Sequence, residues 1–166
     1  VNVPSAFYVS TANYLKFPDG NFYADTRSGS TFSSAEPAAF GFLGTTRATI
    51  SVKDAVIYNK RGALGLIGGD VEIDHAGIWT DHGDIRLVAN GVVTSEVAPS
   101  GALPLAEGRL MVSNGSGVFS AASTLAAGGR IDVAAGEMGI NGGASVGTST
   151  STAMPAGAVS AEKFSA

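Results

Sequence analysis

The chain has 166 residues, of which 45% are hydrophobic, 14% are charged and 23 are glycine. This composition is too apolar for a disordered chain and too rich in glycine for a helix bundle, and the length fits a single domain. The net charge is −4, so the electrostatic attraction on which nucleic-acid binding depends is missing, and no nucleic-acid partner is expected.

The chain contains no cysteine, which excludes disulfides, thiolate metal ligands and cysteine nucleophiles. No apolar run approaches the roughly 18 residues of a membrane-spanning helix. The first residue is Val1 rather than Met, which predicts a processed chain or a piece of a longer one. A composition without cysteine is compatible with export.

Residues 1–45 are the first predicted unit and are rich in aromatic side chains. The tripeptide Pro18-Asp19-Gly20 is typical of a tight turn. We therefore expect this unit to start the fold and to carry a hairpin-like excursion.

Residues 46–141 are the second predicted unit, in which apolar residues recur at every other position. This two-residue period is typical of short strands with one buried face, and glycines between the strands mark turns. The predicted core comprises twelve residues: Ile50, Val52, Leu64, Leu66, Val71, Ile73, Ile85, Leu87, Leu110, Val112, Ile131 and Val133.

The sequence also shows a repeat that is longer than this two-residue period. A shift of 21 residues places Ile50 on Val71, and the same shift later places Leu110 on Ile131. Between these blocks the repeat is longer than 21 residues, because Ile85 corresponds to Leu110. The extra residues predict a loop at 92–107. Repeats of this length with a β signature indicate a solenoid.

The predicted fold is therefore all-β, a parallel β-helix with coils of about 21 residues whose equivalent residues stack at the spacing of neighbouring strands. An antiparallel sandwich with evenly spaced strands is the alternative. Residues 142–166 fall to Gly, Ala, Ser and Thr with one proline, which predicts a thin last coil or a tail.

Three segments resemble the N-terminal region of two-partner-secretion exoproteins, the group named for filamentous haemagglutinin. They are STANYLKFPDG at 10–20, FGFL at 40–43 and GGDVEIDHAGIWTDHGDIRLVANG at 68–91. The resemblance covers a little over half of the chain. It implies a right-handed parallel β-helix exported through an outer-membrane partner.

The family also carries Asn-Pro-Asn motifs that its transporter recognises, and no Asn-Pro occurs in this chain. We therefore expect the chain to begin after that half of the family's region and to lack a complete secretion signal. His75-Ala76 and His82 stand where the family often has glycines, which predicts bulkier corners.

The pattern that most resembles a metal-binding site consists of Asp74-His75 and Asp81-His82, with Asp84 nearby. His and Asp are both metal ligands. The separation of the two pairs is about a third of one predicted coil, so they are expected at different corners as solvated residues. A bound cation is the alternative.

Three other patterns bear on catalysis. Asp70, Glu72 and Asp74 alternate on an outward face above Thr49, Ser51 and Lys53, which favours charge decoration over paired acid and base groups. Gly115-Ser116-Gly117 lacks the strand-to-helix elbow of a serine nucleophile. The glycine-rich stretch 65–69 lacks the lysine of a phosphate-binding loop.

The predicted function is a non-enzymatic structural and interaction segment of a secreted, adhesin-like surface exoprotein, with no catalytic, cofactor-binding or metal site. The expected partners are an outer-membrane transporter, a receptor or glycan on a host or neighbouring cell, and a second copy packed head to tail. The location implied is extracellular, on a Gram-negative-type bacterium. Alternatives are a polysaccharide lyase or hydrolase, and the stalk of a secreted cytolysin or contact-dependent effector.

Overall fold

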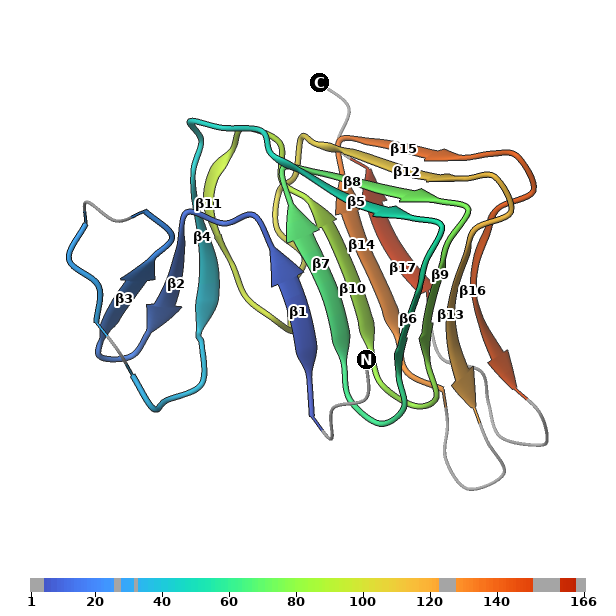
Figure 1. Cartoon of the computed structure of the whole chain (residues 1–166), viewed down its shortest axis with the longest axis horizontal. Coiled ribbons are helices and arrows are strands. Elements are labelled where there is room, and N and C mark those ends of the chain that lie inside the picture. Colours follow the sequence, from blue (N-terminus) through green and yellow to red (C-terminus); the bar gives the residue numbers. More distant parts are fainter. Residues whose placement is uncertain (1–4, 26–27, 32, 123–127, 151–158, 164–166) are drawn as a thin grey trace.

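The computed structural model describes residues 5–25, 28–31, 33–122, 128–150 and 159–163, and within these ranges the chain forms β-strands in four sheets (Figure 1). The all-β prediction is confirmed. No helix in this part of the chain is long and apolar enough to cross a membrane.

Three of the sheets are parallel throughout. Sheet A has five strands in the order β1 (Phe7–Ser10), β7 (Leu64–Gly68), β10 (Ile85–Ala89), β14 (Ile131–Ala135) and β17 (Val159–Lys163). Sheet C has four, β15 (Glu137–Ile140), β12 (Arg109–Ser113), β8 (Asp70–Asp74) and β5 (Thr49–Lys53). Sheet D also has four, β16 (Ser145–Thr150), β13 (Gly117–Ala122), β9 (Gly77–Thr80) and β6 (Val56–Asn59).

Sheet B is antiparallel and stands beside sheet A (Figure 1). Its strands, in order, are β11 (Thr94–Val97), β4 (Ala39–Leu43), β2 (Tyr14–Phe17) and β3 (Gly20–Tyr23). Pro18 and Asp19 connect β2 to β3. Residues 92–107, expected to be a loop, contain β11, which pairs with β4.

The predicted right-handed parallel β-helix with coils of about 21 residues is wrong. The strands form four separate sheets, of which one is antiparallel, so parallel and antiparallel pairing are mixed in one chain. The spacing between paired strands also varies. Ile50 pairs with Val71 as the first shift predicts, but Val71 pairs with Leu110 and Leu110 with Met138, which are longer and unequal steps along the chain.

The physical reason is that strands of different sheets carry the same apolar alternation. The apolar pattern aligns Ile85 with Leu110 and Leu110 with Ile131, yet Ile85 of sheet A pairs with Ile131, and Leu110 belongs to sheet C. Alternation reports that one face of a strand is buried. It does not report which strand lies alongside.

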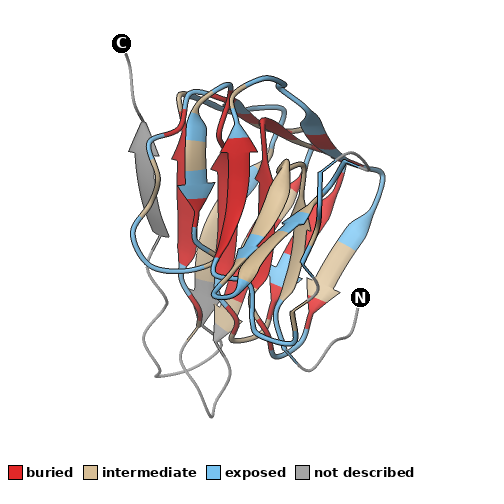
Figure 2. Ribbon diagram, turned by 90° about the vertical axis from the view of Figure 1, so that its left-hand side faces the viewer, coloured by how far each residue is buried: buried red, intermediate tan, exposed pale blue. Residues whose placement is uncertain are grey.

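The predicted core is confirmed, because all twelve residues are buried and Ile50 lies next to Val71. These side chains belong to one cluster shared by sheets A, C and D. A second cluster lies between sheet A and sheet B, where Phe40 and Phe42 of β4 meet Ile67 and Val88. Sheet A is thus covered on both faces, which explains why β7, β10 and β14 are buried along their whole length (Figure 2).

The corners between sheets C and D share an unusual backbone conformation. Asp54, His75 and Asn114 have φ of 49°, 48° and 54°, and Gly142 at the next equivalent corner has φ of 60°. This left-handed conformation turns the chain sharply after β5, β8, β12 and β15. The Asp54 and His75 side chains at two of these corners lie at the border of sheet D, whereas the Asn114 side chain donates a hydrogen bond to Asp74 of sheet C.

The predicted last unit, 142–166, contains β16 and β17. Residues 151–158 and 164–166 of that unit lie outside the described residues.

Candidate binding surface on sheet D

The outer face of sheet D carries a row of aromatic side chains. Because side chains alternate along a strand, Ile78 of β9 and Val118 of β13 point into the core while their neighbours point outward. Tyr58 on β6 pairs in register with Trp79, and Trp79 pairs with Phe119. We call Tyr58, Trp79 and Phe119 the aromatic row.

Glycines beside the aromatic row determine how its rings lie. Gly77 and Gly117 stand two positions before Trp79 and Phe119 on the same strands. A Cβ atom on Gly117 would lie 2.6 Å from Cε2 of Phe119, and one on Gly77 would lie 3.3 Å from Nε1 of Trp79. The two rings therefore lean back along their own strands and occupy the space above the glycines, which keeps the surface low and open.

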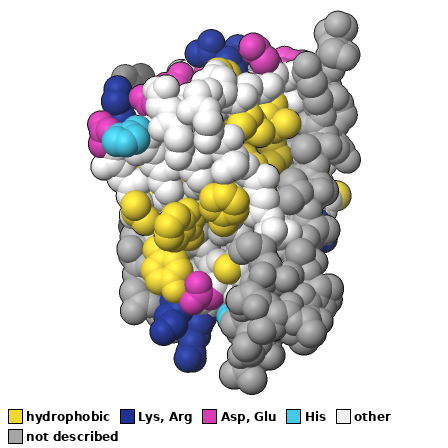
Figure 3. Space-filling view, turned by 90° about the vertical axis from the view of Figure 1, so that its right-hand side faces the viewer, with side chains coloured by type: hydrophobic (Ala, Val, Ile, Leu, Met, Phe, Trp, Pro, Cys, Tyr) yellow, Lys and Arg dark blue, Asp and Glu magenta, His cyan; other side chains and the backbone are white. Residues whose placement is uncertain are grey.

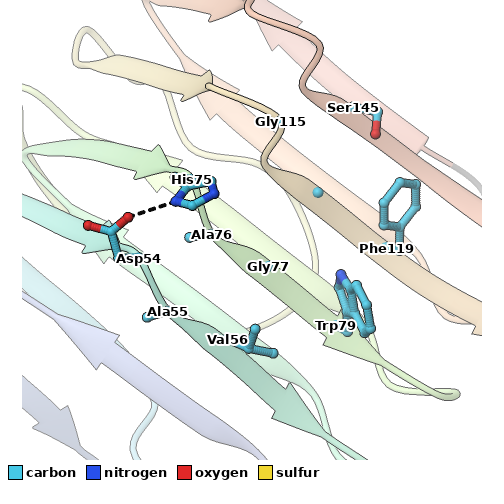
Figure 4. A pocket seen from close by; sticks show the side chains of 11 residues that line it. Asp54, Ala55, Val56, His75, Ala76, Gly77, Trp79, Gly115, Phe119 and Ser145 are labelled. Carbon is cyan, nitrogen blue, oxygen red and sulfur yellow. Dashed lines mark hydrogen bonds and ion pairs between the residues drawn. The ribbon is translucent and has the colours of Figure 1, made fainter.

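This arrangement forms an open hollow of about 450 Å³ on the surface (Figure 4). Trp79 and Phe119 lie side by side on β9 and β13, with Val56 on β6 at one side and Ser145 on β16 at the other. Trp79 is 48% exposed and Val56 is 65% exposed, which is high for large apolar side chains in a folded domain. Figure 3 shows the resulting hydrophobic patch on this face.

Polar groups border the hollow near the corner between sheets C and D. Nδ1 of His75 lies 2.7 Å from Oδ1 of Asp54, and both side chains are exposed (Figure 4). At the far end of the row, the hydroxyl of Tyr58 donates a hydrogen bond of 2.6 Å to Asp81. This hydrogen bond raises the pKa of Tyr58 above its ordinary value, so the phenol stays protonated and uncharged near neutral pH.

The two histidine pairs of the sequence do not come together. His75 contacts Asp54 rather than Asp74, and it follows β8, whereas Asp81 and His82 follow β9. Asp84 accepts a hydrogen bond from the backbone N–H of Arg130 instead. Among the described residues, no group of three or more His, Asp or Glu side chains is placed to hold a metal ion.

Each of the three alternating carboxylates of β8 has partners of its own. Asp70 binds the Arg47 guanidinium at 2.8 Å and accepts a hydrogen bond from the backbone N–H of Arg109. Lys53 lies 3.4 Å from Asp74, as its predicted position above that residue implies. Burial alone would raise the pKa of Asp70, but these hydrogen bonds and charges outweigh it and lower the pKa.

Ser116 and residues 65–69 have structural roles. The buried Ser116 hydroxyl lies within hydrogen-bond distance of the carbonyls of Ser113 and Ile73 and accepts from the backbone N–H of Ala76, so it ties β8 to the turn before β13. Residues 65–68 lie within β7. Gly69 donates its backbone N–H to the carbonyl of Ala48.

The aromatic row was not identified as a site from the sequence. One signal for it is visible there, because the first repeat shift places Tyr58 on Trp79. The same shift matches Phe119 with Ile140, although Phe119 is the neighbour of Trp79 on the side opposite Tyr58. The unequal repeat therefore concealed the third aromatic residue.

Comparison of this chain with protein-family models, with curated proteins and with solved structures found no match. The expected roles in secretion and adhesion therefore have no support from known proteins, and the four separate sheets contradict the expected parallel β-helix.

Proposed function

We propose that this chain is a non-enzymatic structural and interaction module that displays the outer face of sheet D to a binding partner. The observation that carries the proposal is the outward-facing aromatic row, with Trp79 at its centre. Trp79 and Phe119 stand on the two inner strands of a sheet whose opposite face is core, so the framework beneath them is rigid. Exposed apolar side chains gathered on a rigid surface are typical of binding sites.

The surroundings of the carboxylates support the non-enzymatic part of the proposal. General acid and base catalysis requires two groups that converge on one substrate atom. Asp70, Glu72 and Asp74 are instead engaged by Arg47, Arg109 and Lys53 respectively, each in its own ion pair. This pattern fits a role in stability of sheet C.

The test is a search for turnover with the 166-residue chain. Polygalacturonate, neutral glycans and a casein substrate are incubated with it, and products are followed by chromatography. We expect no product. Turnover of any of these substrates that a single change at Asp70, Asp74, Asp81 or Asp84 to Asn abolishes would overturn the proposal. Such turnover of a glycan would establish the alternative, a polysaccharide-active enzyme.

Export through an outer-membrane partner stays a prediction that rests on the resemblance of three sequence segments. Its test is co-expression with a transporter of the two-partner type. Because the chain has no Asn-Pro-Asn motif, we expect export only when it is fused behind a segment that carries these motifs. Retention of that fusion inside the cell would contradict the resemblance.

A further inference from the structure

We infer that the ligand of the sheet D surface is an uncharged glycan chain, whose sugar rings stack on Trp79 and Phe119. The inference rests on the proposed function and specifies the chemical class of the partner. Three features of the surface support it, namely the placement of the rings, the charge of the lining and the pairing of the strands beneath.

Aromatic rings such as those of Trp79 and Phe119 can stack on the flat faces of sugars. The C–H bonds on one face of a pyranose carry partial positive charge and are attracted to the negative face of an aromatic ring. Tyr8 with Phe40 and Tyr14 with Tyr23 are ring pairs in contact, whereas Trp79 and Phe119, both in the described part of the chain, are not stacked on each other.

The spacing of the row also suits a repeating ligand. Adjacent strands of a sheet lie about 4.8 Å apart, which is close to the length of one pyranose residue in an extended chain. Tyr58, Trp79 and Phe119 follow one another at this step across β6, β9 and β13. A glycan lying across the strands would meet one aromatic side chain at each sugar.

The charge of the hollow favours an uncharged ligand. The described residues that line it include no lysine or arginine, and their one carboxylate, Asp54, is paired with His75. An anionic saccharide would therefore gain no lysine or arginine contact from these residues and would be repelled by Asp54. Sugar hydroxyls, in contrast, can hydrogen-bond with Asp54, His75 and Ser145 at the border.

The two strands beneath Trp79 and Phe119 are closed to peptide binding by strand addition. β9 is paired with β6 and β13, and β13 is paired with β9 and β16, so the backbone edges of both strands are already used. A partner that lies over Trp79 and Phe119 must therefore be recognised through side chains. The aromatic rings, bordered by polar groups, are suited to a ligand with apolar faces and hydroxyl edges.

Trp79 is the single tryptophan of the chain, so its fluorescence reports on this site alone. The experiment titrates the unmodified chain with cellohexaose, mannohexaose and chitohexaose, and with a trigalacturonate as the anionic probe. Emission of Trp79 and calorimetry are both followed. We expect a saturable change in emission with at least one neutral hexasaccharide and none with the anionic probe.

Three variants locate the binding. Trp79→Ala and Phe119→Ala should each weaken binding at least about tenfold in calorimetry. Gly117→Ala keeps every aromatic atom but displaces the Phe119 ring, and it should weaken binding severalfold. Its matched control is Gly139→Ala, which meets the flexible end of Met111 on sheet C in the same way and should leave affinity unchanged.

The inference is overturned if no neutral hexasaccharide binds at millimolar concentration, or if the three variants bind it as tightly as the unmodified chain does. It is also overturned if the anionic probe binds more tightly than the neutral hexasaccharides. A fourth contrary result is a change in Trp79 emission with protein concentration alone that Phe119→Ala abolishes. The last result would show that a second copy covers this face. Shortened oligosaccharides in the titrated samples would instead contradict the non-enzymatic proposal and leave the binding inference standing.

Discussion

A buried ion pair on the face of sheet A that is turned toward sheet B offers a quantitative test of the structure. Arg86 on β10 pairs in register with Asp132 on β14, and the residues are 3% and 6% exposed. Their side chains are 3.5 Å apart, and the Arg86 guanidinium also donates to the carbonyls of Gly101 and Ala102 at 3.2 and 2.7 Å. The pair thus ties the segment after β11 to sheet A.

The cost of breaking this pair depends on which partner is removed. Asp132→Asn leaves the Arg86 charge buried without its carboxylate, and loss of one partner of a buried pair costs about 3–5 kcal/mol. Arg86→Met removes the buried charge itself, and Asp132 keeps its ion pair with the half-exposed Arg130 at 2.6 Å. The loss is then two hydrogen bonds to carbonyls, about 1–3 kcal/mol in all.

The double variant Arg86→Met/Asp132→Asn separates these effects. Once Arg86 is gone, Asp132→Asn no longer leaves a buried cation without its carboxylate, so its cost should fall by about 2 kcal/mol or more. The free energies of unfolding are measured by urea titration, and the coupling between the two sites should be about 2 kcal/mol or more. Additive effects within about 0.5 kcal/mol would refute the assignment of a coupled buried pair.

Three further predictions concern stability. Leu66→Ala removes a fully buried side chain from the middle of sheet A and should cost about 2–5 kcal/mol in the same titration; a cost below about 1 kcal/mol would contradict its place in the core. The pKa of Asp70 is lowered despite burial, because Arg47 and a backbone N–H of β12 bind the carboxylate. The ionised carboxylate therefore stabilises the fold at pH values above the unfolded-state pKa of about 3.9, and this stabilisation is lost as the pH falls further. Unfolding midpoints between pH 7 and pH 2 should decline more steeply for the unmodified chain than for Asp70→Asn, and equal slopes would contradict the assignment. Gly142→Ala forces a side chain into a backbone at φ 60° and should cost about 1–2 kcal/mol, whereas Gly29→Ala, with open space around it, should have little effect on the thermal midpoint.

The sequence by itself determined the strand class and the inside of the molecule. Alternating apolar residues such as Leu64 and Leu66 identified buried positions, and all twelve predicted core residues are buried. This succeeds because the two-residue period is a property of each strand alone, and burial of one face imposes it whatever lies alongside.

Only the tertiary structure decided which strands are neighbours. Ile85 and Leu110 carry equivalent alternation, but Ile85 pairs with Ile131 in sheet A and Leu110 with Val71 in sheet C. The chain between them leaves the parallel sheets to add β11 to sheet B, and this excursion changes the spacing of equivalent strands without changing the pattern within them.

The candidate site depended on those same pairings. The first repeat step aligned Tyr58 with Trp79, whereas Phe119 joins them through a much longer step that spans the β11 excursion. Hydrogen bonds between strands far apart in the sequence bring the three rings onto one face, and local periodicity does not encode them. Residue type therefore determined that aromatic side chains were present, and strand pairing determined that they form one surface.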